Sequence, residues 1–410
     1  MTANSSLPFY TFDISRLLSR SSASAPTGID RVELEYARYL CQHAEDRLQF
    51  SAVHPFGRLS ILPFEIAKSF IEKIGVFWDN GEQGKAVQKL STRLMRSLIL
   101  PKFKQNTDHT RPDVYLLMSH HHLTRPSIFE TIKRRNNSFF VPMVHDLIPL
   151  QYPEYSREKE PSRHKRRIET VVKFSDGVLT PSLAVRDALL PYFQHSPRPE
   201  VPIWPAPLGV SPRTTAASYS LQVTTEKPYF VCLGTIEGRK NHLLLLNVWR
   251  RLIEIHGAKT PRLLIIGKRG WENEQVIDMI ERTPSFAGIV REYNNLPNDE
   301  VVALLKNARA LLFPSFSEGF GLPLAEALAL NVPVICSDIP VFQEVGKNKV
   351  TYLDPIDGLG WLDTISTYSS LKTPQTPPPY FEDNDALNWD TSVKNGLLEI
   401  ENFISQKKLA

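Results

Sequence analysis

The sequence predicts an α/β protein made of two doubly wound Rossmann-like domains that face each other across a cleft. Its 410 residues exceed the roughly 100–200 residues of a typical domain. Short apolar, β-branched runs alternate with helical patterns along most of the chain, and a polar stretch, Ser211–Lys227, interrupts this alternation near the middle. Near-continuous apolar strands separated by helices are typical of parallel sheets covered by helices on both faces.

The strands and helices are predicted from the period of the apolar residues. In the first half the expected strands are Phe9–Asp13, Val114–Met118, Val141–Val144, Val178–Thr180 and Ile203–Pro205, with a helix at Asp30–Gln42. In the second half the expected strands are Tyr229–Leu233, Leu263–Ile266, Gly288–Val290, Ala310–Phe313 and Val332–Cys336. Helices are expected between them at Asn241–His256, Asn298–Asn307 and Leu322–Leu330.

The breaks in this pattern predict the domain boundaries. We expect an N-terminal domain at residues 1–211, a linker at 212–227 and a C-terminal domain at 228–385. Four prolines within Lys372–Tyr380 exclude a helix there. A last helical pattern follows, and we expect this helix, at about 390–410, to pack back on the N-terminal domain.

Composition excludes several classes of protein. Hydrophobic residues at 42% and charged residues at 22% exclude a disordered chain, a coiled coil and a collagen-like repeat. No apolar run approaches the roughly 20 residues that span a bilayer, and the first residues lack the pattern of a secretory signal. The three distant cysteines fit neither a disulfide framework nor a zinc site, so we expect a cytoplasmic protein.

Basic residues gather in the first half of the chain. Residues 1–225 contain 29 Lys and Arg against 21 Asp and Glu, whereas the remainder contains 19 against 23. This asymmetry indicates an anionic partner, or it is an ordinary feature of the surface. Nucleic acid is not expected as a partner, because the basic half lacks interleaved aromatic residues.

The segment Phe313–Glu326 carries the strongest chemical signal. A predicted strand ends at Phe313, a loop with two glycines follows, and a helix begins near Leu322 with Pro323 in its first turn. The backbone amides of Gly319, Phe320, Gly321 and Leu322 are placed to bind an anion at the helix N-terminus. Two carboxylates, Glu318 and Glu326, flank this site and suit the paired hydroxyls of a sugar or a ribose. Phosphate and hydroxyl ligands together predict a nucleotide-sugar site.

This segment strongly resembles the signature of the retaining GT-B glycosyltransferases of family GT4, the mannosyltransferase-like group 1 enzymes. Glu318 and Glu326 form the E-x7-E pair inside a Pro-Ser-x-x-Glu-Gly-Phe-Gly-Leu-Pro-x-x-Glu-Ala block. The resemblance continues through Asn331–Pro340 and Leu233–Asn241. It implies a GT-B architecture in which the C-terminal domain binds the nucleotide sugar and the N-terminal domain binds the acceptor.

The resemblance implies roles for several residues of the C-terminal half. Arg239 and Lys240 are expected to grip the donor diphosphate, whose charge grows as the glycosidic bond breaks. Many relatives have an arginine where this chain has Thr235, so phosphate binding is expected to depend more strongly on the basic pair. Glu318 is expected to accept donor-sugar hydroxyls and Glu326 to accept the ribose. The segment from Tyr293 to Leu296 matches the region that brackets the nucleobase.

In the N-terminal half, His145 follows a predicted strand, where ligands of open α/β sheets bind. The resemblance implies that this imidazole orients the donor sugar near the anomeric carbon. Asp146 is expected to hold the imidazole or to cap the next segment. Gly28 lies in a loop that in the family lies beside the phosphates and the acceptor; an ordinary helix N-cap is the alternative. The run Ser119–His122 suggests a metal cluster, but adjacent histidines on an extended chain point to opposite sides. We expect loop histidines that line the acceptor site and no metal.

Two basic segments, Gln83–Leu100 and Arg157–Arg167, bear on the acceptor. The first has an apolar face and a lysine- and arginine-rich face, the pattern of a helix at an anionic membrane surface. A packed helix with a solvated basic face is the alternative. Family members often act on lipid-linked glycans, so we expect a cytoplasmic protein that associates with the inner membrane face.

We therefore expect a metal-independent, retaining hexosyltransferase that acts on a glycan or lipid-linked saccharide in surface polysaccharide or glycoconjugate biosynthesis. Mannose from GDP-mannose is the first choice of donor, and a UDP-hexose or UDP-N-acetylhexosamine is the alternative. A nucleotide-sugar epimerase of similar architecture and a catalytically silent scaffold are the rival classes.

Overall fold

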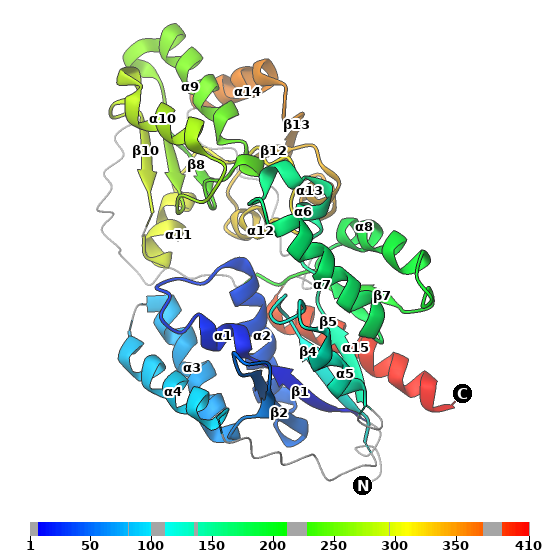
Figure 1. The fold of residues 1–410 in the computed structure, drawn as a ribbon. Coiled ribbons are helices and arrows are strands. Elements are labelled where there is room, and N and C mark those ends of the chain that lie inside the picture. Colours follow the sequence, from blue (N-terminus) through cyan, green and yellow to red (C-terminus); the bar gives the residue numbers. More distant parts are fainter. Residues whose placement is uncertain are drawn as a thin grey trace. The chain divides into compact units, whose positions relative to one another are not determined.

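The computed structural model describes residues 7–80, 82–99, 111–134, 138–210, 228–294, 296–371 and 388–409. The chain forms two compact units, each with its own sheet (Figure 1). Unit 1 comprises Met1–Leu147, Ser162–Gly209 and Trp389–Ala410, and unit 2 comprises Ile148–Pro161 and Val210–Asn388. The expected linker at 212–227 and the proline-rich break at 372–380 lie outside the described residues.

The sheet of unit 1 has the strand order β3-β2-β1-β4-β5. Strands β6 and β7 pair with each other, and a bridge between Met143 and Leu179 joins them to the chain just after β5. The strands are β1 (Phe9–Asp13), β2 (Leu48–Val53), β3 (Leu59–Ile61), β4 (Asp113–Leu117), β5 (Ser138–Pro142), β6 (Val178–Thr180) and β7 (Ile203–Pro205). All five strands predicted in this half are confirmed, with shifts of up to three residues at their ends.

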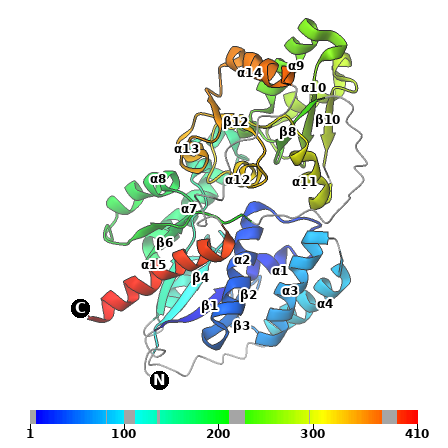
Figure 2. The same ribbon diagram turned by 180° about the vertical axis from the view of Figure 1, so that it is seen from behind.

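Helices surround this sheet. They are α1 (Ser15–Ser19), α2 (Gly28–His43), α3 (Phe64–Asn80), α4 (Gly84–Ser97), α5 (Pro126–Lys133), α7 (Glu160–Phe174), α8 (Leu183–Gln194) and α15 (Trp389–Leu409). Figure 2 shows α15 beside α2 in this unit. The Tyr10 hydroxyl donates to Glu401 of α15 at 2.8 Å, and Arg47 pairs with the same carboxylate at 2.9 Å.

The sheet of unit 2 has the order β10-β9-β8-β11-β12-β13, and neighbouring strands pair in parallel. The strands are β8 (Tyr229–Leu233), β9 (Arg262–Ile266), β10 (Val290–Tyr293), β11 (Leu311–Phe313), β12 (Val334–Ser337) and β13 (Thr351–Leu353). The helices are α6 (Ile148–Gln151), α9 (His242–His256), α10 (Glu274–Arg282), α11 (Asn298–Lys306), α12 (Leu322–Ala329), α13 (Pro340–Gly346) and α14 (Gly358–Ser370). The predicted α/β class with two Rossmann-like sheets is confirmed.

The two faces of this sheet are covered by different helices. Alternate residues such as Phe230, Leu263 and Leu312 form one core cluster with Trp249 of α9 and Trp361 of α14. On the opposite face Phe313 stacks on Phe342 of α13, with ring centroids 4.7 Å apart. Burial on both faces explains why these strands are near-continuous apolar runs.

Helix α4 forms most of the basic segment at 83–100, and its association with a membrane surface stays a prediction. Val87 and Leu94 of its apolar face are fully buried, and α4 packs against α3 within unit 1. The helix is therefore a packed helix with a solvated basic face. Among the described residues, no helix is both long and apolar enough to cross a membrane.

Candidate active site

In each unit the strand order reverses direction at one point. In unit 2, β9 and β10 follow β8 to one side of the sheet, whereas β11, β12 and β13 lie on the other side. The loops after β8 and β11 therefore leave the same edge of the sheet side by side. Ligands of doubly wound sheets bind at such a switch point. Arg239 and Lys240 lie on the first loop, and Glu318 lies on the second.

The structure brings these three side chains into direct contact. Lys240 Nζ lies 2.5 Å from Glu318 Oε1, and Arg239 Nη1 lies 2.9 Å from Glu318 Oε2. Arg239 also donates to the Ser317 carbonyl at 2.9 Å, and the Phe316 amide donates to the Arg239 carbonyl at 2.9 Å. The two loops are thus joined by both side-chain and backbone hydrogen bonds. Three of the four residues predicted to be catalytic form one cluster.

Burial and close pairing shift the pKa values of Lys240 and Glu318. The side chains of Lys240 and Glu318 are each only 9% exposed. Burial alone would raise the pKa of Glu318, but the charges and hydrogen bonds of Arg239 and Lys240 prevail and lower it to about 2. Burial lowers the pKa of Lys240 from its usual value, partly offset by the charge of Glu318. Glu318 is therefore an anion at neutral pH.

Sequence reasoning missed three members of this cluster. Glu237, 2% exposed, pairs with Arg239 Nη2 at 2.7 Å. The Ser315 hydroxyl donates to Glu318 Oε1 at 2.8 Å, and the Lys240 ammonium lies 4.7 Å from the centre of the Phe313 ring. Ser315 lies within Phe313–Glu326 and Glu237 within Leu233–Asn241, the motifs already described. Their partners, Glu318 and Arg239, lie three and two residues away on the same loops, and this proximity in sequence was the available signal.

The loop predicted to bind an anion ends, as expected, at the N-terminus of α12, which begins at Leu322. Within the described residues, the amides of Phe320, Gly321 and Leu322 donate to no protein group. Gly321 caps the helix with φ of 93°, a conformation that favours glycine. A Cβ at Gly321 would lie 2.8 Å from the Phe342 ring. Glycine at this position thus permits both the turn and the close packing beneath the amides.

The remaining predicted residues of unit 2 lie around this switch point. Thr235 follows β8 on the same loop as the basic pair. Glu326 is the fifth residue of α12 and therefore lies in the second turn of this helix. The sequence pattern predicts a place in the first turn, and this prediction is wrong. Tyr293 is the last residue of β10. It was expected to lie after the strand, but β10 begins at Val290, two residues later than predicted, and so includes Tyr293. Tyr293 accepts from the Gly267 amide at 2.8 Å through its carbonyl. The roles of these residues toward a ligand remain predictions.

His145, the fourth predicted catalytic residue, belongs to unit 1 and is 6% exposed. Its Nε2 lies 2.8 Å from the Met118 carbonyl, so the expected partner Asp146 does not hold the ring through that nitrogen. A carbonyl only accepts, so Nε2 of His145 carries the proton and Nδ1 is an acceptor. Burial lowers the pKa of His145 to about 4.

His145 is packed in a group of three imidazoles. The ring of His120 lies 5.3 Å from that of His145 and 5.1 Å from that of His164. His120 Nε2 accepts from the His145 amide at 3.2 Å, so its proton lies on Nδ1. Within the described residues, no group of His, Cys, Asp or Glu side chains is arranged to hold a metal ion.

We expect the His145 and His120 imidazoles to remain neutral and to differ in tautomer. Burial disfavours the charged form of both rings, so neither should titrate near the usual histidine pKa of about 6.5. Long-range ¹H–¹⁵N spectra of histidine-labelled protein should show an Nε2–H form for His145 and an Nδ1–H form for His120 down to about pH 5.5. The variants His145→Gln and His120→Gln would assign the signals. A half-protonated His145 near pH 6.5 would contradict the geometry.

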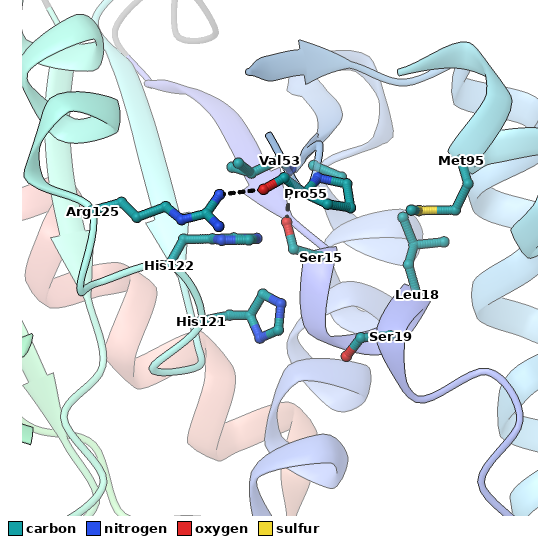
Figure 3. Close-up of a pocket in the computed structure, with 10 residues that line it drawn as sticks. Ser15, Leu18, Ser19, Val53, Pro55, Met95, His121, His122 and Arg125 are labelled. Carbon is teal, nitrogen blue, oxygen red and sulfur yellow. Dashed lines mark hydrogen bonds between the residues drawn. The ribbon is translucent and has the colours of Figure 1, made fainter. Parts of the chain in front are cut away.

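A cavity of about 330 Å³ lies at the switch point of unit 1, between the ends of β1, β2 and β4 (Figure 3). His121 and His122 line it, with their rings 4.3 Å apart, and burial lowers the pKa of each to about 4. Arg125 at the rim donates to the Pro55 carbonyl at 2.7 Å. The other lining residues are Ser15, Leu18, Ser19, Ala52, Val53, Pro55 and Met95. Two of the three loop histidines thus line a cavity, while His120 contacts His145.

Gly28 is the first residue of helix α2, and the loop before it forms an ordinary helix N-cap, one of the two structures expected for it. Thr27 is the N-cap, its side chain accepts from the Asp30 amide, and Asp30 accepts from the Thr27 amide at 2.7 Å. This is a complete capping box. Arg16 and Arg20 also bind the Asp30 carboxylate, at 2.6 and 3.2 Å. The loop is therefore built as a helix cap held by two arginines.

Comparison with known proteins links this chain to one family. Residues 215–355, which include both loops of the cluster, match the family model described as glycosyl transferases group 1. A serotype-specific mannosyltransferase, WbdA of Escherichia coli, is 28% identical over 274 residues, which cover 64% of this chain and 33% of that protein. O-antigen chain mannosyltransferase B of Escherichia coli is 35% identical over 140 residues, covering 34% of this chain and 35% of that protein. The chain thus spans about a third of the length of these curated relatives.

Among solved structures, the α,α-trehalose 6-phosphate synthase of Burkholderia multivorans resembles this chain with a TM-score of 0.60. The sequences are 11% identical, and the match covers 98% of this chain and all of that one. At this identity the likeness concerns the fold alone, and it extends over both units.

Proposed function

We propose that this chain, whose residues 215–355 match the group 1 glycosyltransferases, is a family GT4 enzyme that transfers a hexosyl residue from a nucleotide sugar to a saccharide acceptor with retention of configuration. We propose GDP-mannose as the donor, which the mannosyltransferase names of its relatives favour. The acceptor would be a glycan or lipid-linked saccharide of surface polysaccharide biosynthesis.

One observation carries this proposal: Glu318, paired with Arg239 and Lys240, stands just before three amides at the start of α12 that donate to no group among the described residues. Amides at a helix N-terminus and two fixed cations suit the oxygens of a diphosphate. A carboxylate beside them suits sugar hydroxyls. These ligand types together match the parts of a nucleotide sugar.

The cluster also limits what Glu318 does. Its Oε1 already accepts from Lys240 and Ser315, whereas a single hydrogen-bonding partner, Arg239, is found for Oε2 among the described residues. A carboxylate oxygen accepts about two hydrogen bonds, so Oε2 has room for one donor-sugar hydroxyl. We assign Glu318 to that hydroxyl and Glu326 to the ribose.

In the proposed reaction, the bond between the anomeric carbon and the diphosphate oxygen breaks, and the acceptor oxygen bonds to that carbon on the same face. The acceptor proton passes to the leaving diphosphate. Arg239 and Lys240 stabilise the charge that develops on this group. No covalent nucleophile is required, because bond breaking and bond formation take place on the same face. Neutral His145 would orient a hydroxyl through Nδ1.

We propose that the unit 1 cavity receives the sugar unit of the acceptor. Its volume of about 330 Å³ falls within the range of about 300–1,000 Å³ common for ligand pockets. Leu18, Val53 and Met95 offer apolar contact for a pyranose face, and Ser15, Ser19 and the neutral histidines offer hydrogen bonds to hydroxyls. An uncharged saccharide fits this lining.

Calorimetry and thermal shift with nucleoside diphosphates test the donor directly. GDP should raise the melting temperature more than UDP or CDP does, and the full chain should release GDP from GDP-mannose when acceptor is present. Preference for UDP would replace GDP-mannose by a UDP-sugar. Absence of a shift with every nucleoside diphosphate at millimolar concentration would refute the proposal.

A further inference from the structure

The segment Ile148–Pro161 belongs to unit 2, although the chain on both sides of it belongs to unit 1. It begins three residues after His145 and contains α6 and a short 3₁₀ turn, Pro153–Tyr155. Contacts with three loops of unit 2, those after β8, β9 and β11, attach it there. We call this segment the tether.

Tyr155 makes the central contacts of the tether. Its ring stacks on Phe316 with centroids 5.5 Å apart and planes inclined by only 5°. Its carbonyl accepts from Trp271 Nε1 at 3.0 Å, and the Arg157 guanidinium lies 4.8 Å from the centre of the Trp271 ring. The tether is thus held through both the ring and the backbone of Tyr155.

Both partners of the Tyr155 ring lie on the loops of the candidate active site. Phe316 stands two residues before Glu318, and its amide donates to the Arg239 carbonyl. A Cβ placed on Gly238, the neighbour of Arg239, would lie 3.3 Å from the Tyr155 ring. The ring therefore lies against the backbone of one loop and a side chain of the other.

We propose that Tyr155 is a positioning residue that holds these two loops in the form that binds the donor. This inference rests on the proposed function. Loops that are ordered before a ligand arrives avoid part of the entropy cost of binding. Tyr155 itself needs no contact with the donor, because the stacking on Phe316 restrains the backbone that leads to Glu318.

Tyr155→Ala should weaken nucleoside diphosphate binding and raise the KM for the nucleotide sugar by about three- to tenfold, the range expected for one lost aromatic pair. The kcat at saturating donor should stay within about twofold, since the loops still close around bound donor. Tyr155→Phe should restore wild-type binding because the ring remains. Tyr192→Ala, which removes a 39% exposed tyrosine of α8 in unit 1, is the matched control.

Trp271→Phe provides a second variant if Tyr155→Ala does not fold. It keeps an aromatic ring but removes the hydrogen bond to the Tyr155 carbonyl, and it should weaken GDP binding by about twofold to fivefold. If the wild type binds nucleoside diphosphate and both variants bind it equally well, the positioning role is wrong while the proposed function stands. If the wild type binds none, the proposed function itself fails.

Discussion

Replacing Glu318 with glutamine should reduce sugar transfer by about 100- to 1,000-fold while the protein stays folded, a loss typical of removing one electrostatic group from an active site. Glutamine keeps the shape of the side chain and still accepts from Lys240 and Ser315 through its carbonyl oxygen. It loses the charge that orients Arg239 and the acceptor capacity that we assign to a sugar hydroxyl. Initial rates with nucleotide sugar and acceptor measure the effect.

The same variant should separate sugar recognition from phosphate recognition. With one negative charge removed, Arg239 and Lys240 are less neutralised, so GDP without a sugar should bind at least as tightly as to the wild type. Glu326→Gln, the same substitution eight residues later, should weaken donor binding and leave most of kcat. Glu281→Gln, in an exposed ion pair with Arg269, controls for the loss of a carboxylate. Wild-type turnover in Glu318→Gln would contradict the assigned role.

Much of the fold follows from local patterns, and the exceptions have physical causes. All ten predicted strands exist, because a strand buried on both faces is a continuous apolar run. The strands β2, β3 and β13 were not predicted. Gln49 and Ser51 interrupt the apolar pattern of β2, Ser60 interrupts that of β3, and β13 is only half-buried and has no continuous apolar run. The antiparallel β2–β3 pair is also an exception to the expected parallel pairing.

The candidate site was predictable where it depends on a loop and its own residues. The basic pair, Glu318 and the glycine loop each follow a predicted strand. Their mutual contacts were not predictable, because Arg239 and Lys240 meet Glu318 only through the adjacency of β8 and β11. Strand order is a property of the whole sheet and leaves no signal in one loop. The tautomers of His145 and His120 likewise depend on backbone atoms distant in sequence.

Gly321→Ala should abolish nucleotide binding and lower the free energy of unfolding by about 2–4 kcal/mol, since it combines two costs. The backbone at Gly321 has φ of 93°, and the new methyl group would meet the Phe342 ring at 2.8 Å, with Phe313 at 3.5 Å. Phe342 and Phe313 are stacked and buried, so neither ring has space to withdraw. The turn must shift, and the three amides that it presents would shift with it.

Gly288→Ala isolates the cost of backbone strain, and the difference from Gly321→Ala gives the steric cost. Gly288 also has a positive φ, 73°, but nothing lies within 4 Å of a Cβ built there. This variant should lose about 1 kcal/mol from backbone strain alone and bind GDP like the wild type. Urea unfolding and calorimetry of both variants, side by side, measure the two costs. If Gly321→Ala binds GDP with unchanged affinity, the amides at the start of α12 do not hold the diphosphate, and the anion must bind elsewhere on the chain.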